Sequence, residues 1–376
     1  MTGTSSSRSV RSVVTADRTV ELSLVDLPVA APGPDEVVVR VEAAAINPSD
    51  LGVLFAGADL DQARTAERNG QPVLIAPLSD PTARAAAGRV GHPLTPGNEG
   101  AGTVIAAGSS DAAQALIGKV VGMVGGEMYT QLRRIDARAC QPFAPGITAA
   151  DAAGWFINPM TASGMLATMR SEGHSAIVHT AAGSSLGRML IRLCAADGVS
   201  LVNVVRRAET AAELREVGAT HVCDSSSSGF SHQLVDAIAA TGATLAFDAL
   251  GGGDLVDEIL DAMERALSRD RPFDRYGSPT HKQVYVYGGL DRRPTTLRRT
   301  YGMSWGVGGW LLMRSLQRLG GEAVAQMQAR VASEVTTTFA TSFTAAIGLA
   351  DVIDPELARG YGRPSTGAKH LIDPRR

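Results

Sequence analysis

The sequence predicts an α/β protein with two domains, one β-rich and one built on a doubly wound parallel sheet. A chain of 376 residues is long for a single hydrophobic core, so two domains are expected. Residues 9–140 alternate apolar and polar positions between Pro and Gly turns, which is typical of β-strands. From about residue 150 onward, short apolar runs alternate with helical stretches, which predicts a parallel sheet with crossover helices.

The β-rich part contains four segments with strand character. They read VELSLVDLP (20–28), DEVVVRVEAAAI (35–46), AGTVIAAG (101–108) and GKVVGMVGG (118–126). Residues 52–95 show little strand character, and a connection of this length is usually functional or mobile. We interpret this insertion either as a substrate lid or as a surface insertion without function.

The second part contains five apolar runs suited to the strands of a parallel sheet. They are Ala176–His179, VSLVNVV (199–205), HVCDS (221–225), ATLAFDAL (243–250) and KQVYVYGG (282–289). Ligands of such sheets bind outside the carboxyl ends of the strands, so a cofactor is expected there. The Gly-rich, aromatic segment 302–313 is expected to form a buried helix and the wall of a cleft or of a subunit interface.

The composition gives no support for binding to nucleic acids or to membrane surfaces. The formal net charge is -3, and no apolar run approaches the roughly 20 residues of a membrane helix. Cys140, Cys194 and Cys223 lie far apart and form no C-x-x-C pair, so neither a zinc ribbon nor a disulfide framework is indicated. These features favour a reduced, cytoplasmic protein.

An altered dinucleotide-binding fingerprint follows the first of the five strands. The fingerprint G-x-G-x-x-G joins a strand to a helix, and its six places here read Ala182, Gly183, Ser184, Ser185, Leu186 and Gly187. Ala182 is compatible with the tight turn, the Ser184 hydroxyl can bond a phosphate oxygen, and Gly187 keeps close helix–strand packing. Unpaired N–H groups at the helix start favour an anion. We predict cofactor contacts from Gly183 to Gly187, although the loop alone is also consistent with a simple turn.

Two arginines after the second strand indicate which nicotinamide cofactor is bound. Proteins that bind NAD place an acid about twenty positions after the fingerprint, where it bonds the ribose 2′-hydroxyl. This chain has Arg206 at that spacing, followed by Arg207. A guanidinium forms charge-assisted, bidentate bonds with a 2′-phosphate, whereas an acid would repel it. We therefore predict NADPH rather than NADH, the alternative being a solvated turn.

Six motifs in order along nearly the whole chain carry a resemblance to a known family. They are AAAINPSDL (43–51), PGNEGAGTV (96–104), NPMTASGML (158–166), AAGSSLG (181–187), FDALGGG (247–253) and YVYGGL (285–290). The chain resembles the medium-chain dehydrogenase/reductase superfamily, and within it the zinc-free quinone oxidoreductase and enoyl reductase branches. The resemblance implies a GroES-like substrate domain made of residues 1–145 and 336–376, with a Rossmann domain, residues 146–335, inserted between them.

The resemblance also implies roles for individual residues. Asn47 is expected beside the nicotinamide ribose and the substrate carbonyl, and Thr161 beside the nicotinamide mononucleotide half; these are the two catalytic candidates. Backbone groups of Gly288, Gly289 and Leu290 are expected at the carboxamide edge. The alternatives are a turn device for Asn47, a helix start for Thr161 and a strand-end turn for the glycines.

Two lysines each have two interpretations. Lys369, in the returning tail RPSTGAKHLIDP, is either a phosphate contact or a solvated lysine, and we favour the solvated lysine. Lys282 follows His281 just before a predicted cofactor strand, so the pair suggests chemistry, but a solvated strand entrance explains both residues.

The resemblance predicts that no catalytic zinc is bound. Zinc-dependent relatives carry a Cys where Asn47 stands and a His where Asn98 stands, and asparagine is a poor zinc ligand. Without a Lewis acid, alcohol oxidation has no stabiliser for the alkoxide. The expected reaction is hydride transfer from NADPH to an acceptor that is already electrophilic, either a quinone or an activated α,β-unsaturated carbonyl compound.

One departure from the family bears on the substrate. Enoyl reductases and several quinone reductases carry a tyrosine shortly after the NPSD motif, but residues 51–55 here read LGVLF. Tyr129 and Tyr287 are possible substitutes as proton donors, although core positions explain both. The missing phenol favours a quinone or enone over the second hypothesis, a 2-enoyl thioester (CoA/ACP) reductase, which the arginines of the insertion, Arg64, Arg68, Arg84 and Arg89, keep open.

A third hypothesis is a non-catalytic NADPH-binding protein, which the two lost glycines and the absent tyrosine support. For all three hypotheses the expected partner is a second copy of the chain, because close relatives pair through their Rossmann sheets.

Overall fold

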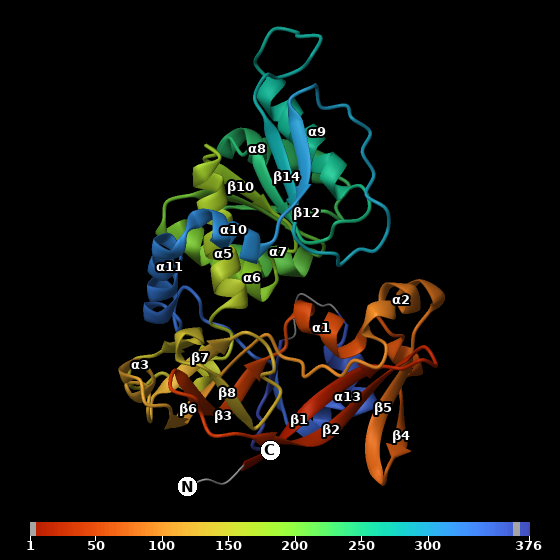
Figure 1. Cartoon of the computed structure of the whole chain (residues 1–376). Coiled ribbons are helices and arrows are strands. Elements are labelled where there is room, and N and C mark those ends of the chain that lie inside the picture. Colours follow the sequence, from red (N-terminus) through yellow and green to blue (C-terminus); the bar gives the residue numbers. More distant parts are fainter. Residues whose placement is uncertain (1–4, 364–368) are drawn as a thin grey trace. The chain divides into compact units, whose positions relative to one another are not determined.

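The computed structural model describes residues 5–363 and 369–376 (Figure 1). These residues divide into two compact units, one reaching up to Ile157 and including Gln328–Arg376, the other comprising Asn158–Met327. The domain limits expected from the sequence, at 145/146 and 335/336, lie near these limits. Whether the units correspond to the expected domains stays a prediction.

The first unit holds an antiparallel four-stranded sheet in the order β1-β2-β5-β4. Its strands are β1 (Ser5–Val14), β2 (Thr19–Val29), β5 (Gln71–Pro77) and β4 (Arg64–Arg68). Val10 and Val14 of β1 and Val20 and Leu22 of β2 are buried in the core of the unit. The alternation expected for a half-buried antiparallel sheet is therefore present over the second half of β1 and the start of β2.

The second sheet of this unit has seven strands in the order β16-β17-β3-β6-β7-β9, with β8 also pairing with β3. The strands are β3 (Glu36–Ala45), β6 (Glu99–Ala107), β7 (Val120–Val124), β8 (Leu132–Asp136), β9 (Cys140–Pro142), β16 (Ala345–Ile347) and β17 (His370–Ile372). β17 runs antiparallel to β3, with Leu371 opposite Ala45. The tail therefore returns to this unit; residues 364–368 of the tail motif lie outside the described residues.

Helices of the first unit are short apart from its boundary helices. They are α1 (Pro48–Phe55), α2 (Asp80–Ala85), α3 (Asp111–Gln114), α4 (Ala149–Ala152), α12 (Leu349–Val352) and α13 (Pro355–Tyr361). The longer helices α5 (Ile157–Ser171) and α11 (Gly321–Ser333) each carry one limit of the two units.

The expectation that residues 52–95 lack strands is wrong. Here β4 and β5 form a hairpin, and Asn69 and Gly70 turn it with φ angles of 51° and 74°. Both central residues thus have the left-handed conformation of a type I′ turn, which suits the twist of a hairpin. Two arginines of this insertion are engaged: Arg68 pairs with Glu21, and Arg89 donates to the backbone carbonyls of Gly52 and Val53.

The second unit is built on six parallel strands in the order β12-β11-β10-β13-β14-β15. They are β10 (Ala176–His179), β11 (Ser200–Val205), β12 (His221–Asp224), β13 (Leu245–Asp248), β14 (Lys282–Val286) and β15 (Trp305–Gly309). Numbered along the chain, the order is 3-2-1-4-5-6, and its reversal between β10 and β13 is the point where such sheets bind ligands.

Helices cover this sheet. α8 (Phe230–Thr241) and α9 (Leu255–Ser268) bury their apolar residues against Val178, Val204 and Val284 on one face. Besides the boundary helices α5 and α11, the other helices of the unit are α6 (Ser185–Ala196), α7 (Ala208–Glu216) and α10 (Leu312–Leu319). Together with the β-rich first unit, this arrangement confirms the predicted fold class, a GroES-like β-rich part plus a doubly wound Rossmann sheet.

The expectation of a helix over residues 302–313 is wrong for its first part. Residues Trp305–Gly309 form β15, which pairs in parallel with β14, and α10 starts only at Leu312. Three glycines within the strand disfavour a helix, and pairing with β14 decides the conformation.

Other sequence-based expectations concern membranes and thiols. Among the described helices, none combines the length and the apolar character that a bilayer span requires. Cys140, Cys194 and Cys223 are free thiols, and burial raises their pKa values to about 12, 12 and 11.

Candidate functional site

The loop between β10 and α6, residues 180–184, prepares the N-terminus of α6 for an anion. Ser184 caps the helix with an extended backbone, and its Oγ accepts a hydrogen bond from the Gly187 N–H at 3.1 Å. The Ala182 N–H donates to the Val204 carbonyl, which ties the loop to β11. Because a hydroxyl that accepts one bond keeps its proton, the Ser184 side chain still has a donor to offer.

Two glycines of this loop, Gly183 and the last fingerprint glycine Gly187, are required by close packing. A Cβ at Gly187 would lie 2.6 Å from the Ala182 carbonyl carbon and closer still to its oxygen. A Cβ at Gly183 would lie 2.5 Å from the Thr210 methyl carbon. Gly187 therefore keeps the helix–strand contact that the third fingerprint glycine allows, and Gly183 makes room for α7.

Arg206 and Arg207 follow the carboxyl end of β11, next to the β10–α6 loop. On one side of them in sequence, the Val204 carbonyl accepts a hydrogen bond from this loop. On the other side, Thr210 packs against the same loop at Gly183. Both arginines are exposed, and within the described ranges neither guanidinium has a hydrogen-bond or ion-pair partner. By contrast, Arg188 on α6 is engaged with Glu213 at 2.6 Å. The structure thus brings the loop and the two arginines together and leaves both guanidinium groups available.

On the other side of the switch point, the loops after β13 and β14 pack backbone to backbone. The buried Asp248 carboxylate accepts from the Thr180 hydroxyl and the Gly251 N–H, both at 2.7 Å. A Cβ at Gly288 would lie 2.5 Å from the Ala249 carbonyl oxygen. The loops that follow β10, β13 and β14 are therefore locked together at the carboxyl edge of the sheet.

The packing of these loops engages one of the backbone groups that we expect to bind the carboxamide of the cofactor. The Leu290 N–H already donates to the Ala249 carbonyl at 3.2 Å, so this donor is engaged. Gly289 is exposed and has no neighbouring atom where its Cβ would be. The contacts of Gly288, Gly289 and Leu290 with a cofactor stay predictions.

Neither tyrosine considered as a substitute proton donor is free. The Tyr129 ring is fully buried, and its hydroxyl donates to the Ala45 carbonyl. The Tyr287 hydroxyl lies 2.9 Å from His179 Nε2, and burial lowers the pKa of His179 to about 4. Burial also raises the pKa values of Tyr129 and Tyr287 well above their usual range, which disfavours both phenols as acids.

In the first unit, Asn47 stands at the start of α1 within a network of buried carboxylates. Its Nδ2 donates to Glu99 Oε1 at 2.8 Å, and its backbone N–H donates to Asp50 Oδ2 at 2.8 Å. Glu99 Oε2 in turn accepts from the N–H groups of Phe156 and Ile157. Asn47 Oδ1 is buried and has no hydrogen-bond partner among the described residues, so it can accept from a ligand.

Asp50 and Glu99 received no role from the sequence, although both stand in quoted motifs. The Asp50 carboxylate accepts the Asn47 backbone N–H, which is one half of a capping box, and it also accepts from the Asn98 N–H at 2.8 Å. Burial raises the pKa of Asp50 to about 6, against the lowering effect of the two backbone donors. The Asn-x-x-Asp spacing is a helix-start signal that predicts the cap but not the burial.

The two predicted catalytic residues belong to different units. Asn47 lies in the first unit, and Thr161 lies on α5 in the second, where it is buried. Their roles toward a nicotinamide therefore stay predictions.

The positions that hold zinc in relatives are occupied by hydrogen-bonded amides. Asn98 Nδ2 donates to the Ser49 hydroxyl at 2.9 Å, as Asn47 Nδ2 does to Glu99. Within residues 5–363 and 369–376, no group of three His, Cys, Asp or Glu side chains suited to a metal is present. The absence of a catalytic zinc stays a prediction.

The solvated positions expected for two lysines are wrong. Lys282 is fully buried and pairs with Glu264 at 2.7 Å, because β14 lies inside the sheet. Lys369 is also buried, because β17 carries it into the sheet of the first unit.

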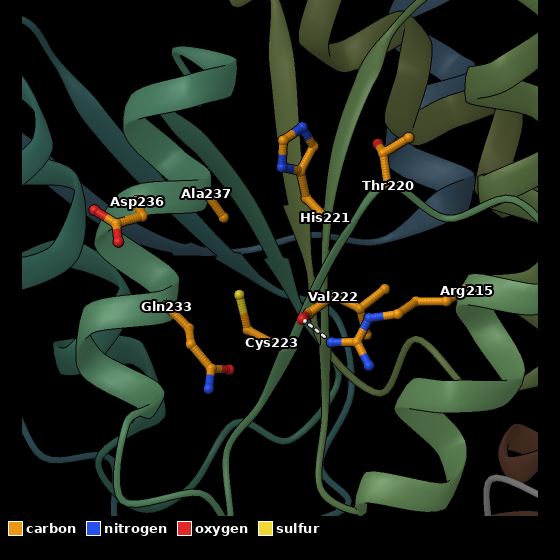
Figure 2. A pocket seen from close by; sticks show the side chains of 8 residues that line it. All are labelled: Arg215, Thr220, His221, Val222, Cys223, Gln233, Asp236 and Ala237. Carbon is orange, nitrogen blue, oxygen red and sulfur yellow. Dashed lines mark hydrogen bonds between the residues drawn. The ribbon is translucent and has the colours of Figure 1, made fainter.

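A depression on the second unit lies away from the switch point, at the edge strand β12 (Figure 2). Figure 2 shows Arg215 from α7 reaching across to this edge, where its Nη2 donates to the Val222 carbonyl at 3.1 Å. Gln233 and Asp236 of α8 line the opposite side. Arg215 occupies a carbonyl of an otherwise open edge, which protects the edge from pairing with another strand.

Comparisons with known proteins find similarity to an alcohol dehydrogenase domain and to reductases. The model of the alcohol dehydrogenase GroES-like domain matches residues 33–171. The synaptic vesicle membrane protein VAT-1 homolog of Rattus norvegicus is 28% identical over 226 residues, which are 60% of this chain and 48% of that protein. The chain thus spans about half the length of the curated relatives it matches.

Solved structures extend the likeness over the whole chain. A candidate NADPH:quinone reductase from Mesorhizobium loti matches with 25% identity and a TM-score of 0.70, covering 100% of both chains. A mutant form of the enoyl thioester reductase from Candida tropicalis matches with 16% identity and a TM-score of 0.68, covering 98% of this chain and 100% of that chain. At this low identity, the second match shows the fold alone.

Proposed function

We propose that the chain, which is similar to the medium-chain dehydrogenase/reductase superfamily, is an NADPH-dependent, zinc-independent oxidoreductase acting on quinones or activated α,β-unsaturated carbonyl compounds. The observation that carries the proposal is the pairing of the β10–α6 loop with two unengaged arginines at the end of β11. This is the place where a doubly wound sheet binds a dinucleotide.

The residues present fit a phosphorylated dinucleotide. Gly183 and Gly187 are positions where a Cβ would collide with its neighbours, so the loop keeps α6 and α7 close. The N-terminus of α6 offers unpaired N–H groups to a pyrophosphate. Arg206 or Arg207 would bond a 2′-phosphate by its guanidinium, and no acid stands there to favour NADH.

A bound reduced nicotinamide supplies a hydride to an electrophilic carbon. The contribution of this chain is to orient the reactants and to accept or donate hydrogen bonds around them. Asn47 is held by Glu99 so that its Oδ1 faces away from the carboxylate as a free acceptor. A ribose hydroxyl or an amide N–H of a ligand would donate the hydrogen bond that Asn47 Oδ1 lacks.

Quinones and enones are the substrates best supported by the side chains. Reduction of a quinone yields oxyanions that water can protonate, and neither Tyr129 nor Tyr287 is available as an acid. The name of the Mesorhizobium loti relative supports a quinone. A 2-enoyl thioester reductase is less supported, because two of the four arginines of the insertion, Arg68 and Arg89, are engaged within the protein.

The proposal includes pairing of two copies through the parallel sheet of the second unit. β15 is the last strand of this sheet, and no described strand pairs with its outer edge. Leu311 and Met313, which follow it, are exposed. A cytoplasmic location is also part of the proposal, and three separate free thiols are consistent with a reducing compartment.

The test is NADPH oxidation by the purified full chain with a panel of acceptors, namely a quinone, an enone and a 2-enoyl-CoA, in the presence of a chelator. We expect turnover with the quinone or the enone exceeding that with the thioester. Turnover with the thioester alone would favour the second hypothesis. NADPH binding without oxidation by any acceptor would favour a non-catalytic protein.

A further inference from the structure

Two buried polar atoms of the first unit lack hydrogen-bond partners among the described residues and belong to the same network. One is Asn47 Oδ1, an acceptor, and the other is Lys369 Nζ, a donor of three bonds. Leaving a buried polar group unpaired is costly, and leaving a buried ammonium unpaired is more so. An unpaired donor and an unpaired acceptor in one network therefore indicate a bound group.

The register of the sheet places these two residues side by side. β17 runs antiparallel to β3 with Leu371 opposite Ala45, and the Ile46 N–H donates to the His370 carbonyl. Continuing this register by one residue brings Lys369 opposite Asn47. The unpaired donor and the unpaired acceptor thus come from neighbouring positions on two adjacent segments.

Two carboxylates lie near Lys369 without accepting a hydrogen bond from it. The carboxylates of Glu99 and Asp50 interact electrostatically with the ammonium and oppose the lowering of its pKa by burial. Glu99 already accepts three hydrogen bonds, from Asn47, Phe156 and Ile157. Asp50 already accepts from two backbone N–H groups.

Gly154, Thr341 and Phe343 also lie near the ammonium. A Cβ at Gly154 would lie 3.5 Å from Lys369 Nζ and 3.4 Å from Thr341 Oγ1, and the Phe343 ring centroid lies 5.7 Å from Nζ. Lys369 Nζ makes no hydrogen bond to any of these three residues. The three lysines of the chain therefore differ: Lys119 is exposed, Lys282 is ion-paired, and only Lys369 is buried without a hydrogen-bond partner in the described part of the chain.

We infer that Lys369 binds the carbonyl oxygen of the substrate, next to Asn47. This inference rests on the proposed function, since a quinone or enone gains negative charge on that oxygen when it is reduced. A charge-assisted hydrogen bond from a water-excluded ammonium stabilises such an oxygen more strongly as its charge develops. Lys369 thereby supplies at the oxygen the stabilisation that the missing tyrosine after the NPSD motif does not.

The experiment compares the full-length wild type with Lys369→Met and Lys369→Arg, and uses Lys119→Met as a matched control at an exposed lysine. Three quantities are measured: NADPH affinity by nicotinamide fluorescence, 1,4-benzoquinone affinity by tryptophan quenching, and kcat/KM for the quinone. We expect Lys369→Met to lower kcat/KM roughly 10- to 100-fold and to weaken quinone binding, the size expected for one hydrogen bond to a charged group. NADPH affinity stays unchanged, and Lys369→Arg recovers part of the loss because it keeps a charged donor.

The alternatives give different results. If Lys369→Met instead weakens NADPH binding, the oxygen is a phosphate oxygen of the cofactor, and the assignment to the substrate is wrong. If the folded variant keeps wild-type values for all three quantities, Lys369 binds no ligand oxygen. Failure of the proposed function gives a different result: none of the tested acceptors then supports NADPH oxidation by the wild type. In that case the comparison of quinone affinities between the wild type and Lys369→Met still decides the role of Lys369.

Discussion

Replacing Gly187 by alanine tests whether close contact between α6 and the β10–α6 loop builds the anion site. The added Cβ would lie 2.6 Å from the Ala182 carbonyl carbon and 2.7 Å from the Ala182 Cα. Ordinary contacts of this kind begin at 3.4 Å. The difference, 3.4 minus 2.6, requires the start of α6 to move away by about 0.8 Å or more. Because the colliding atoms are backbone, no side-chain rotation relieves the contact.

This displacement has two expected consequences. Overpacking of this kind costs about 2–4 kcal/mol in the free energy of unfolding, even though alanine favours a helix over glycine by about 1 kcal/mol. It also moves the N–H groups of the helix start away from a bound pyrophosphate. Losing one charge-assisted hydrogen bond weakens NADPH binding about tenfold or more.

Urea unfolding and a fluorescence titration with NADPH measure the two effects. Gly52→Ala is the matched control, because Gly52 lies within α1 and has no atom within 4 Å of its Cβ position. We expect this control to be neutral or to stabilise by about 0.5–1 kcal/mol. A Gly187→Ala variant with wild-type stability and wild-type NADPH affinity would refute the packing argument.

Three further predictions follow from other contacts. Gly183→Ala brings a Cβ to 2.5 Å from the Thr210 methyl carbon and is expected to lower the free energy of unfolding by about 1–3 kcal/mol. Thr210→Ser removes that methyl group, so the double variant should recover most of the loss when a double-mutant cycle is measured by urea unfolding. Additive effects of the two substitutions would contradict the contact. Burial holds the pKa of Asp50 at about 6 in place of 3.8, so the folded state binds the proton more tightly and the free energy of unfolding falls as pH rises from about 4 to about 7. The difference, 6 minus 3.8, sets an upper limit of about 3 kcal/mol, to be measured by urea unfolding against Asp50→Asn, whose stability should lack this component. Dialysis against a chelator should leave NADPH oxidation unchanged, and a loss restored by zinc would contradict zinc independence.

Local patterns of the sequence are sufficient to predict much of the second unit. The strand Ala176–His179 has the bounds that the apolar run predicts, and the predicted helix follows the loop from Ser185. Ser184 caps the helix as serine commonly does. These elements depend on residues close in sequence, so the strand, loop and helix around the fingerprint are predictable from the sequence alone.

The insertion shows where such patterns are insufficient. Residues Arg64–Arg68 form a strand whose side chains are nearly all exposed, so no apolar alternation marks it. Its partner, Gln71–Pro77, contains a run of buried residues instead. The Asn69-Gly70 pair is the local signal for the hairpin, and the flanking residues give it no support from alternation.

The network around Asn47 depends on contacts that are distant in sequence. Glu99 comes from β6, and Lys369 comes from the tail through the pairing of β17 with β3. Burial of a lysine is uncommon, so the sequence favoured a solvated position. Only the register of the sheet brings Lys369 opposite Asn47, and no local pattern encodes that register.

The most direct test of the central claim is a fluorescence titration of the purified chain with NADPH and with NADH, repeated with Arg206→Ala. The exposed, unpaired guanidinium at the end of β11 predicts that the wild type binds NADPH more tightly than NADH. It also predicts that Arg206→Ala weakens NADPH binding roughly 10- to 100-fold while NADH binding stays the same. Equal affinities for both cofactors, unchanged in the variant, would contradict the assignment of NADPH.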